Sequence, residues 1–129
     1  MSALIAVAVV GAHLEGQPLH HQLTSRGATL VVRTATAPCY RMYALATEPA
    51  KPGLVRVAES EGGAVEVEVW ALDAEGFATF VDGIPAPLAI GRVVLADGSD
   101  VAGFLCEPIA TIGAEDITAY GGWRGYLAR

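Results

Sequence analysis

The sequence predicts an α+β fold built around a curved or barrel-like mixed sheet. Two observations favour this class. Segments with the alternation or β-branched content of strands outnumber those with helical spacing, and the expected order is strand, helix, several strands, helix, hairpin and short tail. With 129 residues, of which 53% are hydrophobic, we expect a single domain spanning residues 1–129 around one core.

The chain begins with a buried strand, a loop and a helix. Residues 3–10 are apolar on both faces and rich in β-branched side chains, which is typical of a central strand covered on both sides. Gly11 and Gly16 bound the loop that follows, and Pro18 fits the first turn of a helix that should end at Gly27. A strand followed by such a loop can direct backbone N–H groups toward an anion.

The middle of the chain is expected to be extended. Pro38 divides residues 28–46, so two strands or one bent strand fit that segment. Residues 54–58 and 64–70 flank two glycines, and in the second run three valines alternate with two glutamates and a tryptophan. This pattern predicts that the two runs pair as a hairpin with one solvent-exposed face.

A helix and a second hairpin follow. Asp73 can cap a helix whose apolar residues recur at helical spacing before Gly83. Residues 92–96 and 101–106 surround an Asp-Gly dipeptide, which tolerates the positive φ of a tight hairpin turn. The tail over residues 114–127 mixes three large aromatics with three glycines, so we expect it to dock on the domain or to be buried in a homodimer.

Composition excludes several classes of protein. A net charge of -6, only 17% charged residues and a mean hydropathy of +0.43 argue against disorder, nucleic-acid binding and membrane-surface binding. The longest apolar run, residues 3–12, is about half of what a bilayer requires, and no basic residue precedes it. We therefore expect a cytoplasmic protein in which Cys39 and Cys106 are reduced core thiols.

Common catalytic signatures are missing from the sequence. It carries no nucleophile elbow and no cluster of ligands at metal-binding spacing, and His20 and His21 should point to different sides of a helix. The glycine spacing between Gly11 and Gly16 matches neither a P-loop nor a dinucleotide fingerprint. We expect no metal and no cofactor.

His13 is the most informative position. It lies in the loop after the first strand, where the amides of residues 11–16 could hold a small anion while the imidazole exchanges a proton. The alternative is a histidine that only holds its own loop through a backbone hydrogen bond. From the sequence pattern alone, that alternative is favoured.

Three further residues are candidates for a substrate site. Arg41 could clamp a carboxylate, although an ion pair with Glu66 or Glu68 is the favoured interpretation. Tyr43 and Tyr120 could wall a pocket, but aromatic residues in a domain of this size usually fill the core.

Several sequence blocks, in order along essentially the whole chain, point to one family. They include Val10-Gly11-Ala12-His13-Leu14-x-Gly16-x-Pro18-Leu19, Thr36-Ala37-Pro38-x-Tyr40-Arg41-x-Tyr43-Ala44-Leu45, Lys51-Pro52-Gly53-Leu54-Val55-Arg56, Gly103-Phe104-Leu105-Cys106-Glu107 and Ala119-Tyr120-Gly121-Gly122-Trp123-Arg124. Together they closely resemble the C-terminal domain of allophanate hydrolase.

This resemblance implies a fold and a function. The fold is similar to γ-glutamylcyclotransferase, a small mixed β-barrel with flanking helices and a ligand cavity near the loop after the first strand. The implied activity is decomposition of N-carboxycarbamate to ammonia and carbon dioxide in urea and allophanate degradation. Because no amidase domain occurs in these 129 residues, we expect a stand-alone protein that works with a separate amidase or urea carboxylase.

The resemblance also implies site residues. The family's proposed catalytic histidine falls on His13, which we expect to act as a general acid on a small anionic substrate. The expected substrate-binding residues are Gly11, Ala12, Leu14, Gly16, Gln17, Arg41, Tyr43 and Tyr120.

Two alternatives remain open. One is a non-catalytic module that binds a small anion or docks on a partner enzyme. The other, which is weaker, is γ-glutamyl cyclisation, because cyclotransferases use a glutamate near residues 80–87, where this chain has only Asp82.

Overall fold

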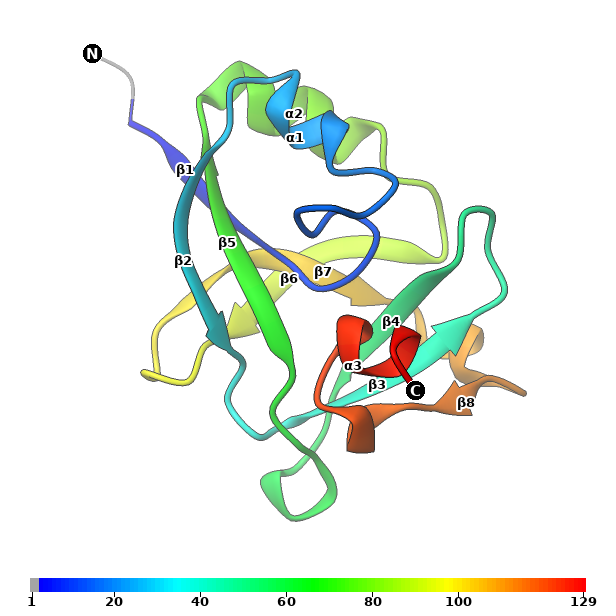
Figure 1. The fold of residues 1–129 in the computed structure, drawn as a ribbon. Helices are drawn as coiled ribbons and strands as arrows, with labels where there is room; N and C mark the ends of the chain where they lie inside the picture. Colours follow the sequence, from blue (N-terminus) through cyan, green and yellow to red (C-terminus); the bar gives the residue numbers. More distant parts are fainter. Residues whose placement is uncertain (1–2) are drawn as a thin grey trace.

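The computed structural model describes residues 3–129, which form two β-sheets with short helices around them (Figure 1). The strands are β1 (Ile5–Val9), β2 (Thr29–Ala35), β3 (Tyr40–Leu45), β4 (Lys51–Arg56), β5 (Glu66–Leu72), β6 (Leu88–Val94), β7 (Asp100–Cys106) and β8 (Glu115–Asp116). The helices are α1 (His21–Thr24), α2 (Ala74–Asp82) and α3 (Trp123–Leu127), with 3-10 turns at Glu59–Glu61, Pro108–Thr111 and Thr118–Tyr120.

The sheet order confirms the α+β class. One sheet has the order β2-β5-β1-β7-β6 and the other the order β4-β3-β8. The outer strands β2 and β6 meet only at one end, where Thr36 and Leu95 form an isolated bridge and the N–H of Ala96 donates to the carbonyl of Ala35 at 3.0 Å. Within residues 3–129 no ladder joins these two edges, so the expected small barrel is not confirmed.

Strand β1 is central, as its composition predicts. It runs antiparallel to β5 and parallel to β7, and Val7, Ala8 and Val9 are fully buried. The ordered strand covers Ile5–Val9 rather than residues 3–10. Its end places the following loop at the edge of the core.

The expected hairpin between residues 54–58 and 64–70 is wrong. Strand β4 pairs with β3, whereas β5 pairs with β1 and β2 in the other sheet. The connection crosses between the sheets and packs closely on β3, because a Cβ on Gly62 would lie 2.8 Å from the backbone nitrogen of Tyr40. The exposed face is wrong too, since Glu68 and Trp70 are buried.

Several local predictions are confirmed. The carboxylate of Asp73 accepts a hydrogen bond from the N–H of Gly76 at 2.6 Å and so caps α2. Strands β6 and β7 form the expected hairpin, with Gly98 at a φ of 89° in the turn. The helix expected after Pro18 is shorter than its pattern suggests, because residues 11–20 form consecutive turns before α1.

The tail packs on its own chain. Trp123 is 3% exposed and stacks on Tyr126 with 5.3 Å between ring centroids. Cys39 and Cys106 are buried and free, as expected. None of the helices in residues 3–129 has the length and apolar composition that a membrane span requires.

Candidate functional site

The loop after β1 is shaped by turns and by two glycines. The N–H of Leu14 donates to the carbonyl of Gly11 at 3.0 Å, and further along the loop the N–H of Gln17 donates to the carbonyl of Leu14. Gly11 is required by close approach, because a Cβ there would lie 2.1 Å from Cδ of Pro52. Gly16 has a φ of 86°, which favours glycine. These constraints hold the loop against the start of β4.

This geometry buries His13 in an aromatic setting. Its imidazole is 6% exposed, stacks on Phe104 and contacts the edge of Phe80. Nε2 lies 2.8 Å from Oε1 of Gln22, and because that oxygen only accepts, Nε2 carries the hydrogen. His20 donates from Nδ1 to the carbonyl of His13 at 2.8 Å and fixes its backbone.

The environment keeps the imidazole neutral at rest. Burial lowers the pKa of His13 to about 4, an effect that the hydrogen bond to Gln22 only partly offsets. The positive charge of Lys51 lowers this pKa further. The resting ring therefore holds no second proton at neutral pH, so general-acid chemistry requires that His13 take up a proton when an anion binds.

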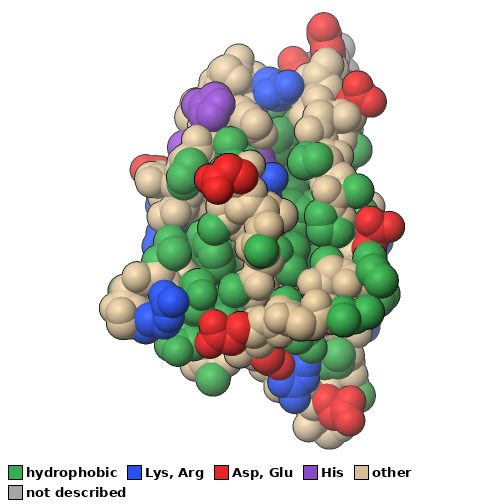
Figure 2. Space-filling view, turned by 90° about the vertical axis from the view of Figure 1, so that its right-hand side faces the viewer, with side chains coloured by type: hydrophobic (Ala, Val, Ile, Leu, Met, Phe, Trp, Pro, Cys, Tyr) green, Lys and Arg blue, Asp and Glu red, His purple; other side chains and the backbone are tan. Residues whose placement is uncertain are grey.

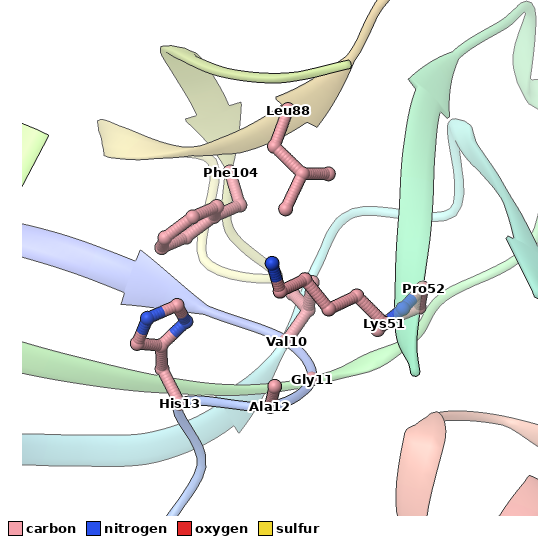
Figure 3. Close-up of a pocket in the computed structure, with 8 residues that line it drawn as sticks. All are labelled: Val10, Gly11, Ala12, His13, Lys51, Pro52, Leu88 and Phe104. Carbon is pink, nitrogen blue, oxygen red and sulfur yellow. The ribbon is translucent and has the colours of Figure 1, made fainter. Parts of the chain in front are cut away.

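Lys51 is a site residue that the sequence-based reasoning missed. It lies at the start of β4, is only 7% exposed, and extends toward Phe104 and Leu88 across from His13 (Figure 3). No carboxylate in residues 3–129 forms a salt bridge with it. The Lys51 residue is thus largely buried, while its ammonium is not fully enclosed, and an ammonium with few neighbours of opposite charge favours the binding of an anion.

Two hollows meet at these side chains. The His13 pocket has a volume of about 10 Å³ and is lined by Val10, Gly11, Ala12, His13, Lys51, Pro52, Leu88 and Phe104 (Figure 3). The side cavity has a volume of about 210 Å³ and is lined by His13, Leu19, Gln22, Pro49, Lys51, Gly83, Ile84, Pro85, Leu88 and Phe104. His13, Lys51, Leu88 and Phe104 line both hollows.

Backbone amides add hydrogen-bond donors at the His13 pocket. Within the described part of the chain, Leu14 and Glu15 are the first residues of the loop whose N–H groups donate hydrogen bonds. The N–H groups of Ala12 and His13 take part in none of these bonds, although both residues line the pocket. These two N–H groups are therefore available as hydrogen-bond donors next to Lys51, and carboxylate oxygens accept from such groups.

Some of the loop residues expected at the site line the His13 pocket and others do not. Gly11 and Ala12 line it. Leu14 is fully buried outside the lining, Gly16 is exposed, and Gln17 is half-buried at the far end of the loop.

The residues expected from β3 and the tail lie elsewhere. Arg41 pairs with Asp116 at 2.6 Å, which corrects its expected pairing with Glu66 or Glu68. Tyr43 lies opposite Asp116 in the smaller sheet. Tyr120 is 42% exposed and packs on Tyr126. Arg41, Tyr43 and Tyr120 line neither of the two hollows that meet at His13.

No metal centre stands out either. Residues 3–129 contain no group of three or more His, Cys, Asp or Glu side chains that could hold a metal ion. Asp82, the residue considered for γ-glutamyl cyclisation, is exposed at the end of α2 and lines neither hollow.

A buried carboxylate on β5 holds the His13 loop through a hydrogen bond from the loop backbone. Glu68 is fully buried and accepts from the N–H of Glu15 at 2.9 Å, from Arg124 at 3.0 Å and from Arg33 at 3.2 Å. Burial raises the pKa of Glu68, but the hydrogen bonds from Glu15, Arg124 and Trp70 outweigh it and hold the pKa below its ordinary value. The charged carboxylate thus ties the His13 loop to β5 and to the tail.

Comparison with known proteins supplies close relatives over the whole domain. A family model, the allophanate hydrolase C-terminal domain, matches residues 5–128. The urea amidolyase of Saccharomyces cerevisiae is 43% identical over 130 residues, which is 98% of this chain and 7% of that protein. The chain therefore spans a small fraction of the curated relatives that it matches.

Solved structures agree with the sequence matches. Allophanate hydrolase of Kluyveromyces lactis superposes with a TM-score of 0.94 at 39% identity, covering 98% of this chain and 21% of that one. A uropathogenic E. coli-specific protein superposes with a TM-score of 0.89 at 37% identity, covering 98% of each chain. A Pyrococcus horikoshii protein, with a TM-score of 0.71 at 21% identity and 96% and 93% coverage of the two chains, shares the fold alone.

Proposed function

The chain belongs to the allophanate hydrolase C-terminal domain family, and on this basis we propose that it decomposes N-carboxycarbamate to carbon dioxide and ammonia within urea and allophanate degradation. A separate amidase supplies the substrate in this proposal. The observation that carries it is that Lys51, which is 7% exposed and forms no salt bridge within residues 3–129, lines the same pocket as the buried imidazole of His13.

Lys51 and the loop amides provide the binding step. N-carboxycarbamate has a carboxylate at each side of one nitrogen. The Lys51 ammonium neutralises one carboxylate, and the N–H groups of Ala12 and His13 donate to its oxygens. Because the pocket wall is otherwise apolar, these interactions are stronger than they would be in water.

His13 provides the proton. The second carboxylate places a negative charge near the imidazole, and such a charge raises the pKa of a histidine. A proton then binds at Nδ1, because Nε2 already donates to Gln22. The anion thereby offsets the burial that keeps the ring neutral at rest.

The chemical step then balances without a cofactor. The bond between nitrogen and one carboxyl carbon breaks, its electron pair stays on nitrogen, and the nitrogen takes the proton from Nδ1 of His13. Carbon dioxide leaves and carbamate remains. Carbamate decomposes in the same way to ammonia and a second carbon dioxide, with the next proton taken from solvent through His13.

The test is to follow the substrate directly. Labelled allophanate is treated with a separate amidase, and the decay of N-carboxycarbamate is followed by carbon NMR with and without this protein. We expect faster decay with the native chain, a loss of at least tenfold in the enhancement for His13→Asn and for Lys51→Met, and none for Arg92→Met. Arg92 is the matched control because it lies on the exposed β6–β7 hairpin, paired with Asp100.

Decay at the uncatalysed rate with the native chain would contradict the proposal. In that case the same pocket would be assigned to a non-catalytic module that binds small anions. Malonate, in which a methylene replaces the nitrogen, would then still bind in a Lys51-dependent manner.

A further inference from the structure

The side cavity is larger than a small dicarboxylate requires. Its volume of about 210 Å³ exceeds the cavity of about 150 Å³ that holds benzene in an engineered protein core. The His13 pocket, at about 10 Å³, has room for roughly one water-sized group, such as one carboxylate oxygen. The carboxylate end of a ligand therefore leaves most of the side cavity unfilled.

The lining of the side cavity changes character along its length. His13, Gln22 and Lys51 supply its polar side chains, and Gln22 accepts a hydrogen bond from His13. The remaining side chains are apolar and come from the loop before α1, the segment before β4, the segment after α2, the start of β6, and β7: Leu19, Pro49, Ile84, Pro85, Leu88 and Phe104. An apolar wall of this kind favours an uncharged group.

Part of the side-cavity wall comes from the β3–β4 connection, through Pro49, and from the segment after α2, through Gly83, Ile84 and Pro85. Both lie on the right-hand side of Figure 1, and Figure 2 shows that face directly. Hydrophobic side chains gather near the centre of this face, and charged side chains lie mostly toward its upper and lower ends. A ligand can therefore reach His13 from this side with its apolar part last.

The lining offers no charged partner to an anionic group placed in the apolar part of the side cavity, away from Lys51 and His13. Among the described residues that line the two hollows, Lys51 is the only one with a formal charge, and none carries a carboxylate. One carboxylate is thus neutralised in the resting site. A second anionic group placed among Ile84, Pro85 and Leu88 would be buried without a partner, which is costly.

We propose that the side cavity is a subsite for an apolar substituent, so that the protein takes N-carboxylated amines whose nitrogen carries a hydrocarbon group. The inference rests on the proposed function for the chemistry at the carboxylated nitrogen. The reaction is the one proposed for carbamate: the bond between nitrogen and carboxyl carbon breaks, the electron pair stays on nitrogen, a proton passes from solvent through His13 to that nitrogen, and carbon dioxide and a free amine are released.

Stable carboxylates test the subsite without any chemistry. Acetate, butyrate, hexanoate and phenylacetate copy such carbamates with a methylene in place of the nitrogen. Their dissociation constants are measured by calorimetry on the native chain and on Ile84→Trp. Ile84 lines the side cavity but not the His13 pocket, so the larger ring should fill the subsite and leave the carboxylate end free to bind.

Affinity for the native chain should rise by about fourfold for each added methylene that fits, up to the size of phenylacetate. In Ile84→Trp that rise should disappear, while acetate should bind as it does to the native chain. Ile112→Trp is the matched control because Ile112 is 76% exposed and lines neither hollow. In Ile112→Trp the affinity should rise along the four carboxylates as it does in the native chain.

The outcomes separate the subsite from the proposed function. Equal affinity for all four carboxylates, or a rise that survives in Ile84→Trp, overturns the subsite and leaves the decay of N-carboxycarbamate as a separate test. Absence of binding by every carboxylate overturns the subsite as well. A circular dichroism melt of Ile84→Trp verifies that the variant folds, and Leu19→Trp, which lines the same cavity from the loop before α1, repeats the test if it does not.

Discussion

The imidazole of His13 stacks on the ring of Phe104, with 4.9 Å between the centroids and 21° between the planes. Phe104 lies on β7 and His13 on the loop after β1, and the two strands are parallel neighbours. This contact removes water from one face of the imidazole. It explains why a loop residue has the pKa of a core residue.

The first prediction concerns stability and pH. The folded pKa of His13 is about 4, below its ordinary value of 6.5, so between these values the unfolded chain binds more protons. The free energy of unfolding therefore rises with pH in this window. When the pH falls from about 7 to 4.5, the titration of His13 alone should lower the free energy of unfolding by about 2 kcal/mol. Urea unfolding at the two pH values measures this difference.

Two variants test whether His13 causes this pH dependence. His13→Phe should lose that part of the pH dependence, because it has no group to titrate. His21→Phe, at an exposed position, should keep it. Equal pH dependence in the native chain and in His13→Phe would mean that the burial of His13 does not set its titration.

A second prediction concerns Lys51. Replacing it by methionine removes a largely buried ammonium that has no salt bridge in residues 3–129, so the free energy of unfolding should stay the same or rise by about 1 kcal/mol. The affinity for malonate should fall by at least tenfold. Calorimetry and urea unfolding on one sample measure both, and unchanged malonate affinity would remove Lys51 from the site.

A third prediction separates two glycines of the loop. Gly11→Ala places a Cβ against the ring of Pro52, so we expect a loss of about 2 to 3 kcal/mol and weaker malonate binding, because the loop must move away from β4. Gly16→Ala meets no atom within 4 Å and adds only backbone strain of about 1 kcal/mol. The two variants are compared by thermal unfolding, and equal losses would contradict the role of close approach.

A fourth prediction concerns Glu68. Glu68→Gln removes one of the two carboxylate partners of Arg33 and of Arg124, which keep Glu15 and Glu66, and it weakens the acceptor for the N–H of Glu15, so we expect a loss of about 2 kcal/mol. Hydrogen exchange at Glu15 should also become faster.

The matched control is an exposed ion pair. Asp100→Asn breaks the pair with Arg92, whose side chains are 64% and 52% exposed for Arg92 and Asp100, and should cost at most about 1 kcal/mol. Losses of the same size in Glu68→Gln and Asp100→Asn would show that burial adds nothing to the Glu68 network.

Local signals in the sequence predict much of the fold. The cap at Asp73, the turn at Gly98 and the buried strand β1 each depend on residues within a few positions of one another, and all three are present. His13 also lies, as predicted, in the loop after the first strand, which ends at Val9.

Long-range pairing is what the sequence does not reveal. Residues 54–58 and 64–70 are close in sequence, yet their strands enter different sheets, since pairing depends on which edges the whole chain leaves open. Glu68 looks like a surface residue in the alternation with valines, and its burial depends on partners that are mostly far away in sequence: the N–H of Glu15, Arg33 and Arg124.

Lys51 was missed for the same reason. It lies far from His13 in sequence, and a lysine at the start of a strand is usually exposed. The one available signal was its position in the Lys51-Pro52-Gly53 block, because Pro52 and Gly53 allow β4 to approach Gly11 and Cys106 closely.

The most direct test of the account is the titration of His13 by histidine-edited NMR with and without malonate. The free chain should show a midpoint near 4, and saturating malonate should raise it by at least one unit, because the second carboxylate faces the imidazole. The rise should be absent in Lys51→Met, which cannot hold the anion. A midpoint that malonate leaves unchanged in the native chain would contradict an anion site shared by His13 and Lys51.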